Sequence, residues 1–168
     1  DRVYAECESV SHICERNGAA DVLIADTRQE QESILRMRNE LYSALMPQLA
    51  EALDLAVPPA RIAAFLDAVD RLAQRFDTRI PCYGHAADGN LHPHLMMDLH
   101  ERGVLQEVRD AIYQEGAKLG GAVTAEHGVG RTRLSYFNLY TDEKSKELMR
   151  GIKRLFDPHT ILNPDASI

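Results

Sequence analysis

The sequence of 168 residues contains no tryptophan and only three cysteines, and none of its apolar runs is long enough to cross a bilayer. It begins with neither a methionine nor a signal peptide, so we expect it to be part of a longer protein. An odd number of cysteines without metal-ligand spacing indicates a reducing compartment, and we expect a cytoplasmic protein. The formal net charge of −7 argues against nucleic acid or an anionic membrane as the main partner.

Apolar residues make up 45% of the chain and charged residues 27%, which is the usual composition of a globular domain. Short apolar runs predict strands at residues 21–25, 53–57, 78–85 and 90–98. Thr141 looks like the N-cap of the last helix. The pattern as a whole predicts an α+β fold, in which a mostly antiparallel sheet has helices packed on one side. Helical spacing predicts helices over about residues 2–16, 29–49, 59–76, 101–119, 133–139 and 142–156.

Three histidines stand close together in the segment YGHAADGNLHPH, residues 83–94. Asp88-Gly89 is a preferred pair for a two-residue hairpin loop, which would place His85 opposite His92 and Tyr83 opposite His94. Opposed side chains share one face of a hairpin, so that face would carry three imidazoles and a phenol. Pro93 cannot donate a ladder hydrogen bond, which indicates either an edge strand or a bulged register.

Two interpretations of these histidines remain open on spacing alone. His85 and His92 could hold a divalent ion, with Glu126 beside His127 as the best candidate for a third ligand. Alternatively, they are surface histidines that hydrogen-bond to water. The Gly-x-Gly that follows His127 favours a flexible turn over a phosphate loop. Arg38 borders an apolar helical stripe, which favours a snorkelling side chain over a carboxylate clamp.

Three ordered segments carry a resemblance to a known family: GHAADGNLHPH, then AEHGVGRTRLSYF, then FDPHTILNP. They resemble the C-terminal domain of the FAD-linked oxidases. These vanillyl-alcohol-oxidase-like flavoproteins include enzymes of the glycolate oxidase, D-lactate dehydrogenase and D-2-hydroxyglutarate dehydrogenase type. The resemblance extends upstream through VPPARI and ILRMRNEL, so the whole of residues 1–168 is expected to be this one domain. Three departures are Ala87 in place of a family glycine, Leu35 in place of a tryptophan, and the ending NPDASI in place of Asn-Pro-Gly-Lys.

The resemblance implies a ferredoxin-like fold and a role for each matching residue. His85, His92 and Glu126 match the family's metal ligands, with Zn or Mn as the expected ion. His127 matches the acid/base residue, which also contacts the substrate. Arg38 matches an arginine that binds the substrate carboxylate. Flavin contacts are expected from two asparagines, Asn163 and Asn90. FAD itself would be bound mainly by an N-terminal domain that this sequence does not contain.

The resemblance therefore implies an FAD-dependent oxidoreductase that oxidises a small D-2-hydroxy acid to the 2-oxo acid. We expect this stretch of chain to be inactive without the FAD domain, and we leave a homodimer open. Two other interpretations stay open. A metal-dependent hydrolase could use the same histidine and glutamate cluster to activate water, without a flavin. A non-catalytic α+β interaction module would carry the histidines incidentally.

Overall fold

The computed structural model describes residues 2–164, which divide into two compact units at Pro47 and Gln48. The N-terminal unit contains α1 (Arg2–Arg16) and α2 (Arg28–Leu45). Gly18, with a φ of +89°, follows the end of α1 as expected. The predicted strand at residues 21–25 is wrong, because this segment has no regular structure. Leu23 is 90% exposed, so the apolar run here does not reflect a buried strand.

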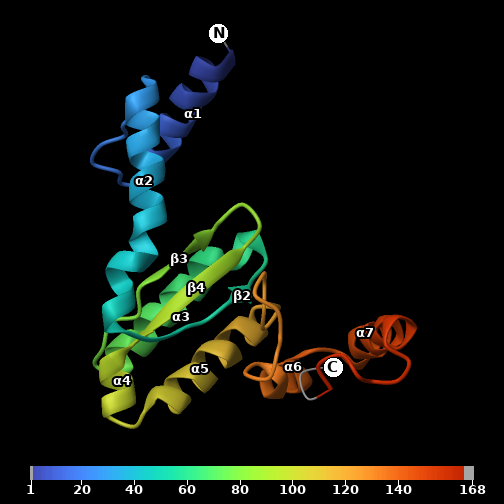
Figure 1. Ribbon diagram of the computed structural model, residues 1–168. Coiled ribbons are helices and arrows are strands. Elements are labelled where there is room, and N and C mark those ends of the chain that lie inside the picture. Colours follow the sequence, from blue (N-terminus) through green and yellow to red (C-terminus); the bar gives the residue numbers. More distant parts are fainter. Residues whose placement is uncertain (1, 165–168) are drawn as a thin grey trace. The chain divides into compact units, whose positions relative to one another are not determined.

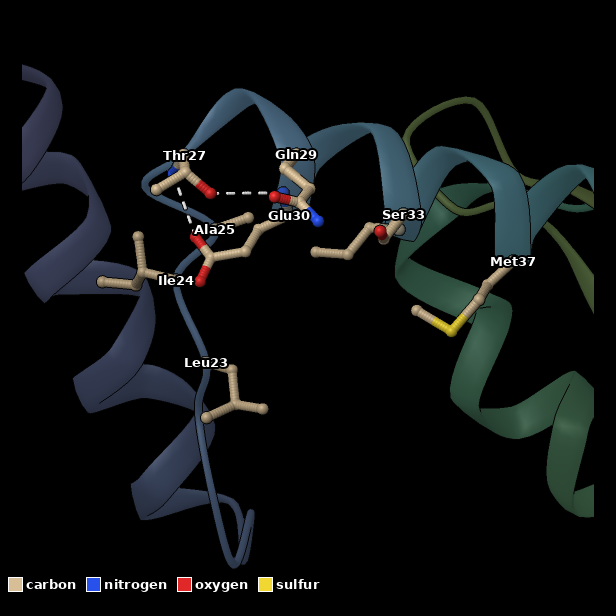
Figure 2. A pocket seen from close by; sticks show the side chains of 9 residues that line it. Leu23, Ile24, Ala25, Thr27, Gln29, Glu30, Ser33 and Met37 are labelled. Carbon is tan, nitrogen blue, oxygen red and sulfur yellow. Dashed lines mark hydrogen bonds between the residues drawn. The ribbon is translucent and has the colours of Figure 1, made fainter.

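Helix α2 begins with a capping box. The Thr27 hydroxyl accepts a hydrogen bond from the Glu30 N–H, and the Glu30 carboxylate accepts one from the Thr27 N–H (Figure 2). An open hollow lies between this start of α2 and the preceding loop, and it includes none of the predicted site residues. Its lining comes from Leu23, Ile24, Ala25, Thr27, Gln29, Glu30, Ser33, Ile34 and Met37 (Figure 2).

The predicted helix over residues 29–49 is too long at its C-terminal end. Helix α2 ends at Leu45, a 3-10 turn follows at Met46–Gln48, and strand β1 then covers Leu49–Ala52. Proline cannot continue a helix, because it lacks an N–H and its ring clashes with the preceding turn. Pro47 stands at this point, and the chain after it enters the sheet of the C-terminal unit.

The sheet contains β1, β2 (Leu55–Ala56), β3 (Cys82–His85) and β4 (Asn90–Met96). Both β1 and β2 pair antiparallel with β4, while β3 pairs with β4 as well. Ala52 lies opposite His94 and Leu55 opposite Leu91, so β1 and β2 form one interrupted strand on the same edge of β4. The edge alternative for β4 is therefore wrong, and the register shift lies between Leu49 and Glu51 of β1, opposite Met96 and Leu95, and not at Pro93.

The order of elements in the C-terminal unit gives a ferredoxin-like path (Figure 1). The interrupted strand β1/β2 leads through a 3-10 turn at Pro59–Arg61 into α3 (Ile62–Arg75), then into the hairpin β3–β4. Helix α5 (Leu105–Lys118) follows, and Ala122 then forms an antiparallel bridge with Ala56. The expected α+β fold, with its antiparallel sheet and helices packed on it, is confirmed.

The core lies between the sheet and helices α3 and α5. Leu91 and Leu95 of β4 belong to the buried apolar cluster, whereas Asn90, His92 and His94 alternate with them on the other face of the strand. The imidazoles therefore project away from the apolar core. The remaining members of the cluster come mostly from the flanking elements: Leu53, Leu55, Val57, Phe65, Val69, Leu72, Phe76, Ile80, Leu99, Val108, Ile112, Tyr113, Val123, Val129, Tyr136 and Phe137.

Three further helices complete the described chain, and two details differ from the prediction. The helix expected over 101–119 begins later, as α5, and a short helix that was not predicted, α4 (Met97–Glu101), precedes it. The last helices are α6 (Leu134–Tyr140) and α7 (Glu143–Phe156). The N-cap of α7 is Asp142 and not Thr141, since the Asp142 carboxylate accepts from the Ser145 N–H at 2.9 Å.

None of the helices within residues 2–164 combines the length and the apolarity needed to cross a membrane.

Candidate active site

The hairpin that carries the histidines has a longer turn than predicted. Residues 86–89 form a four-residue turn, so Tyr83 lies opposite His92 and His85 lies opposite Asn90. The predicted pairing of His85 with His92, and of Tyr83 with His94, is therefore wrong by two residues. A shift of two positions returns each side chain to the same face of its strand, so the prediction that these side chains share one face still holds.

Gly89 explains the longer turn. It has a φ of +78° and approaches the Val57 backbone so closely that a Cβ would lie 1.8 Å from the Val57 carbonyl oxygen. The Val57 N–H donates to the Gly89 carbonyl at 3.0 Å, and the Asp88 carboxylate accepts from the Asn90 N–H at 3.0 Å. These contacts tie the turn to the end of β2, and a tight two-residue loop would not make them.

The imidazoles divide into two groups on this face. The His94 ring stacks on Tyr83, with ring centroids 4.4 Å apart, and its Nδ1 lies 3.2 Å from the Pro81 carbonyl oxygen. Burial lowers the pKa of His94 despite that contact. The rings of His85 and His92 lie 6.1 Å apart, and His92 also stacks on His127 at 5.2 Å. His92 and His127 thus join the hairpin to the Gly-rich segment.

Glu126 is the centre of the second group. Its Oε1 lies 3.2 Å from His92 Nε2, 3.6 Å from His127 Nε2 and 3.9 Å from His85 Nε2. The His92 side chain is only 10% exposed, whereas those of His85, Glu126 and His127 are between 41% and 48% exposed. Two segments far apart in the sequence therefore place three imidazoles around one carboxylate, with most of the group open to solvent.

The donor atoms of His85, His92 and Glu126 fit a divalent ion. One donor atom from each lies within 4.8 Å of the other two. Metal–nitrogen bonds of about 2.0–2.1 Å place neighbouring ligand atoms roughly 3–4 Å apart, close to the spacing seen here. Two imidazoles and a carboxylate are also a usual donor set for Zn, Mn or Fe, and three protein ligands leave positions for a substrate. A second group, Asp54, His92 and His127, shares the middle histidine.

Asp54 was not among the site residues predicted from the sequence. This carboxylate is fully buried between β1 and β2 and accepts hydrogen bonds from the 124–127 segment. Burial alone would raise the pKa of Asp54, but hydrogen bonds from the Thr124 hydroxyl and from the N–H groups of His127 and Ala125 hold it below its usual value. A lone acid inside the apolar run LDLAV was the available signal, because unpaired acids are rarely fully buried.

Comparison with known proteins identifies the family. A family model described as "FAD linked oxidases, C-terminal domain" matches residues 1–166. The chain belongs to this family. It is 38% identical over 162 residues to a D-lactate dehydrogenase of Archaeoglobus fulgidus, and 32% identical over 169 residues to the glycolate oxidase protein GlcD of Bacillus subtilis. A D-2-hydroxyglutarate dehydrogenase of Stutzerimonas stutzeri is 26% identical over 171 residues.

These matches cover 96%, 98% and 98% of the chain, in the same order, but only 36%, 36% and 37% of the three relatives. The chain thus spans about a third of the length of these curated proteins. The family membership confirms the resemblance seen in the three sequence motifs. The residue roles that the resemblance implies remain predictions.

Three further residues predicted for this FAD-linked oxidase domain come from three different parts of the chain. Arg38 lies on α2 in the N-terminal unit and donates to the Asn39 side-chain oxygen at 3.2 Å. Asn90 is 5% exposed, and its Oδ1 has no hydrogen-bond partner among the described residues. Asn163 has a φ of +47° in the segment after α7. The predicted departure at the ending falls mainly on residues 165–168, which lie outside the described residues.

Proposed function

We propose that the chain is the substrate-binding part of an FAD-dependent oxidoreductase that oxidises a small D-2-hydroxy acid to the 2-oxo acid. The observation that carries this proposal is the meeting of His85 and His92 with Glu126 and His127 around one solvent-accessible point. The printed names of the relatives, which include D-lactate and D-2-hydroxyglutarate dehydrogenases, support the substrate class. FAD, bound elsewhere in the whole protein, supplies the hydride acceptor.

In this proposal His127 acts as the general base. Its side chain is 48% exposed, so a bound hydroxy acid can reach its imidazole. His127 takes the proton of the substrate hydroxyl, and Glu126, 3.6 Å away, stabilises the resulting imidazolium. Imidazole is the side chain most often used for this step near neutral pH.

The remaining residues bind and orient the substrate. His85, His92 and Glu126 would hold a divalent ion, which acts as a Lewis acid toward the hydroxyl when bound. Arg38 would pair with the substrate carboxylate, because a planar guanidinium suits a bidentate contact. Asn163 and Asn90 would contact the flavin. The expected partners are thus one small acid and the FAD-binding part of the protein.

Anaerobic flavin reduction in the full-length protein tests the proposal. Glycolate and the D- and L-forms of lactate and 2-hydroxyglutarate would each be mixed with the oxidised protein, and loss of flavin absorbance followed. We expect a D-acid or glycolate to reduce the flavin and the L-acids to fail. His127→Gln should slow the reduction by about 10²–10⁴-fold with FAD still bound, because general-base catalysis contributes on that scale.

His100→Gln is the matched control, since His100 is exposed on α4 away from the cluster. It should leave the reduction rate unchanged. Full activity of His127→Gln would contradict the assigned base. A full-length protein without flavin that hydrolyses esters or amides would favour the metal-dependent hydrolase instead.

A further inference from the structure

Asp54 is a fully buried carboxylate whose hydrogen bonds all come from one short segment. Its Oδ2 accepts from the Thr124 hydroxyl at 2.7 Å, from the His127 N–H at 2.9 Å and from the Ala125 N–H at 3.0 Å. The Glu126 N–H lies 3.3 Å from the same oxygen. A buried carboxylate needs such donors, since an unsatisfied buried charge is strongly destabilising.

These hydrogen bonds fix the backbone positions of two site residues, Glu126 and His127. The backbone N–H groups of Glu126 and His127 both point at the Asp54 carboxylate, so the Cα atoms from which their side chains leave are fixed relative to the sheet. The segment 124–127 lies outside any helix or strand, and Gly128 and Gly130 follow it directly. Without this anchor the 124–127 backbone would lose a set of hydrogen bonds that no other described group supplies.

The same carboxylate also faces the hairpin. Asp54 falls in the gap between β1 and β2, where the flanking pairs place it beside His92. Its Oδ1 lies 3.7 Å from His92 Nδ1, about 0.5 Å beyond the usual range of an N–H···O hydrogen bond. This Nδ1 is buried and has no hydrogen-bond partner among the residues that the structure describes. Asp54 Oδ1 is thus placed to accept from an Nδ1–H of His92.

We propose that Asp54 is the positioning residue of the site: it anchors the backbone that carries Glu126 and His127, and it holds the proton of His92 on Nδ1. A neutral imidazole carries one ring proton, and an ionised carboxylate can only accept. The Nδ1–H tautomer leaves the Nε2 lone pair of His92 available to a cation held between it and Glu126, whose Oε1 lies 3.2 Å away. That is the tautomer a metal ligand requires, and this part of the inference rests on the proposed function.

The tautomer of His92 can be measured without metal and without activity in Glu126→Ala, because this variant lacks the carboxylate 3.2 Å from Nε2 that competes for the proton. The imidazole ¹⁵N shifts of the full 168-residue chain would be recorded well above the usual imidazole pKa of about 6.5. We expect His92 to carry its proton on Nδ1 in Glu126→Ala. When Asp54→Asn is added, the amide can donate to Nδ1, so we expect the proton to move to Nε2 in most molecules. Amide spectra of the same samples report whether the fold is retained.

Binding of Mn²⁺, followed by electron paramagnetic resonance, gives the second readout. Loss of an orienting carboxylate typically lowers metal affinity about 10–100-fold, so Asp54→Asn should weaken Mn²⁺ binding on that scale. Thr124→Val removes one donor to Asp54 but keeps the carboxylate beside His92, and it should preserve the Nδ1–H tautomer. Asp67→Asn, at an exposed position of α3, is the matched control and should change neither readout.

A His92 proton found on Nε2 in Glu126→Ala would overturn the inference, even if Asp54→Asn failed to fold. An unchanged tautomer and unchanged Mn²⁺ affinity in a folded Asp54→Asn would overturn it too. The proposed function fails separately: a full-length protein that oxidises no hydroxy acid, yet shows the Asp54-dependent tautomer, would refute that function and support the positioning role.

Discussion

At the scale of single residues, Gly84 and Gly89 allow close backbone contacts, the first between β3 and β4 and the second between the turn and Val57. A Cβ on Gly84 would lie 2.1 Å from the Asn90 carbonyl oxygen, a separation that real atoms do not reach. Gly84→Ala should therefore force β3 away from β4 beside His85 and destabilise the protein by roughly 1–3 kcal/mol. Urea unfolding measures this. Gly151→Ala, where nothing lies within 4 Å of the added carbon, is the control. Equal stability of the two variants would contradict the close packing.

His85 tests the metal site with the least risk to the fold, since its side chain is 41% exposed. We expect His85→Ala in the full-length protein to remove stoichiometric divalent metal, because two of three protein ligands rarely retain an ion through purification. Elemental analysis after gel filtration measures the metal content. His100→Ala should keep it. A full-length protein that is free of metal yet fully active would leave only hydrogen bonding for His85 and His92.

Cys82 is predicted to be unreactive in the native protein. Burial, with a smaller contribution from the Asp70 charge, raises the pKa of its thiol to about 12, so almost none of it is thiolate at neutral pH. All three cysteines are partly buried by exposed area, but Cys82 packs against the apolar cluster, whereas Cys7 and Cys14 lie on α1, which has no buried residue. Native alkylation with iodoacetamide, read by mass spectrometry, should modify these two well before Cys82. Equal labelling of all three before unfolding would contradict the buried environment.

The site residues differ in how far they could be predicted from the sequence. Residue type and order were enough to predict His85, His92, Glu126 and His127, and the structure brings them together. Asp54 could not be found in this way. A single acid in a short apolar strand has no motif, and its importance depends on the distant segment 124–127 that donates to it.

At the scale of elements, amphipathic helices were predicted most accurately. Helix α3 follows its apolar spacing and begins after Pro58-Pro59, as expected. Elements that depend on partners were harder to predict. The apolar run 21–25 forms no strand, and β1 was missed, because only its first residue, Leu49, fell within a predicted element. The hairpin register was missed because the contact between Gly89 and Val57, which no local pattern contains, selects the longer turn.

Phe65 tests the packing of α3 against the sheet. It is fully buried in the apolar cluster, and its ring lies near Gly116 of α5. Phe65→Ala would leave a cavity and should lower the free energy of unfolding by about 3–5 kcal/mol. Chemical denaturation measures the loss. Phe156→Ala, at an 81% exposed position of α7, should cost far less. Similar losses for both variants would contradict the assigned core.

At the scale of the whole molecule, the two units have different roles. Every residue of the buried apolar cluster lies between Leu53 and Phe137, and the histidine site is built from the same unit. Arg38, the predicted carboxylate partner, lies in the other unit. Removal of residues 1–47 should therefore leave cooperative unfolding and Mn²⁺ binding intact. Calorimetry and paramagnetic resonance measure these, and loss of cooperative unfolding would contradict the independence of the C-terminal unit.

The central claim is that two distant segments build one site for a divalent ion and a hydroxy acid. Anomalous diffraction from crystals of the full-length protein soaked in Mn²⁺ tests it most directly. The account predicts one strong peak about 2.0–2.3 Å from His85 Nε2, His92 Nε2 and a Glu126 carboxylate oxygen, with His127 beside it. Crystals in which Glu126 and His127 lie far from the two hairpin histidines, with no peak between them, would contradict it.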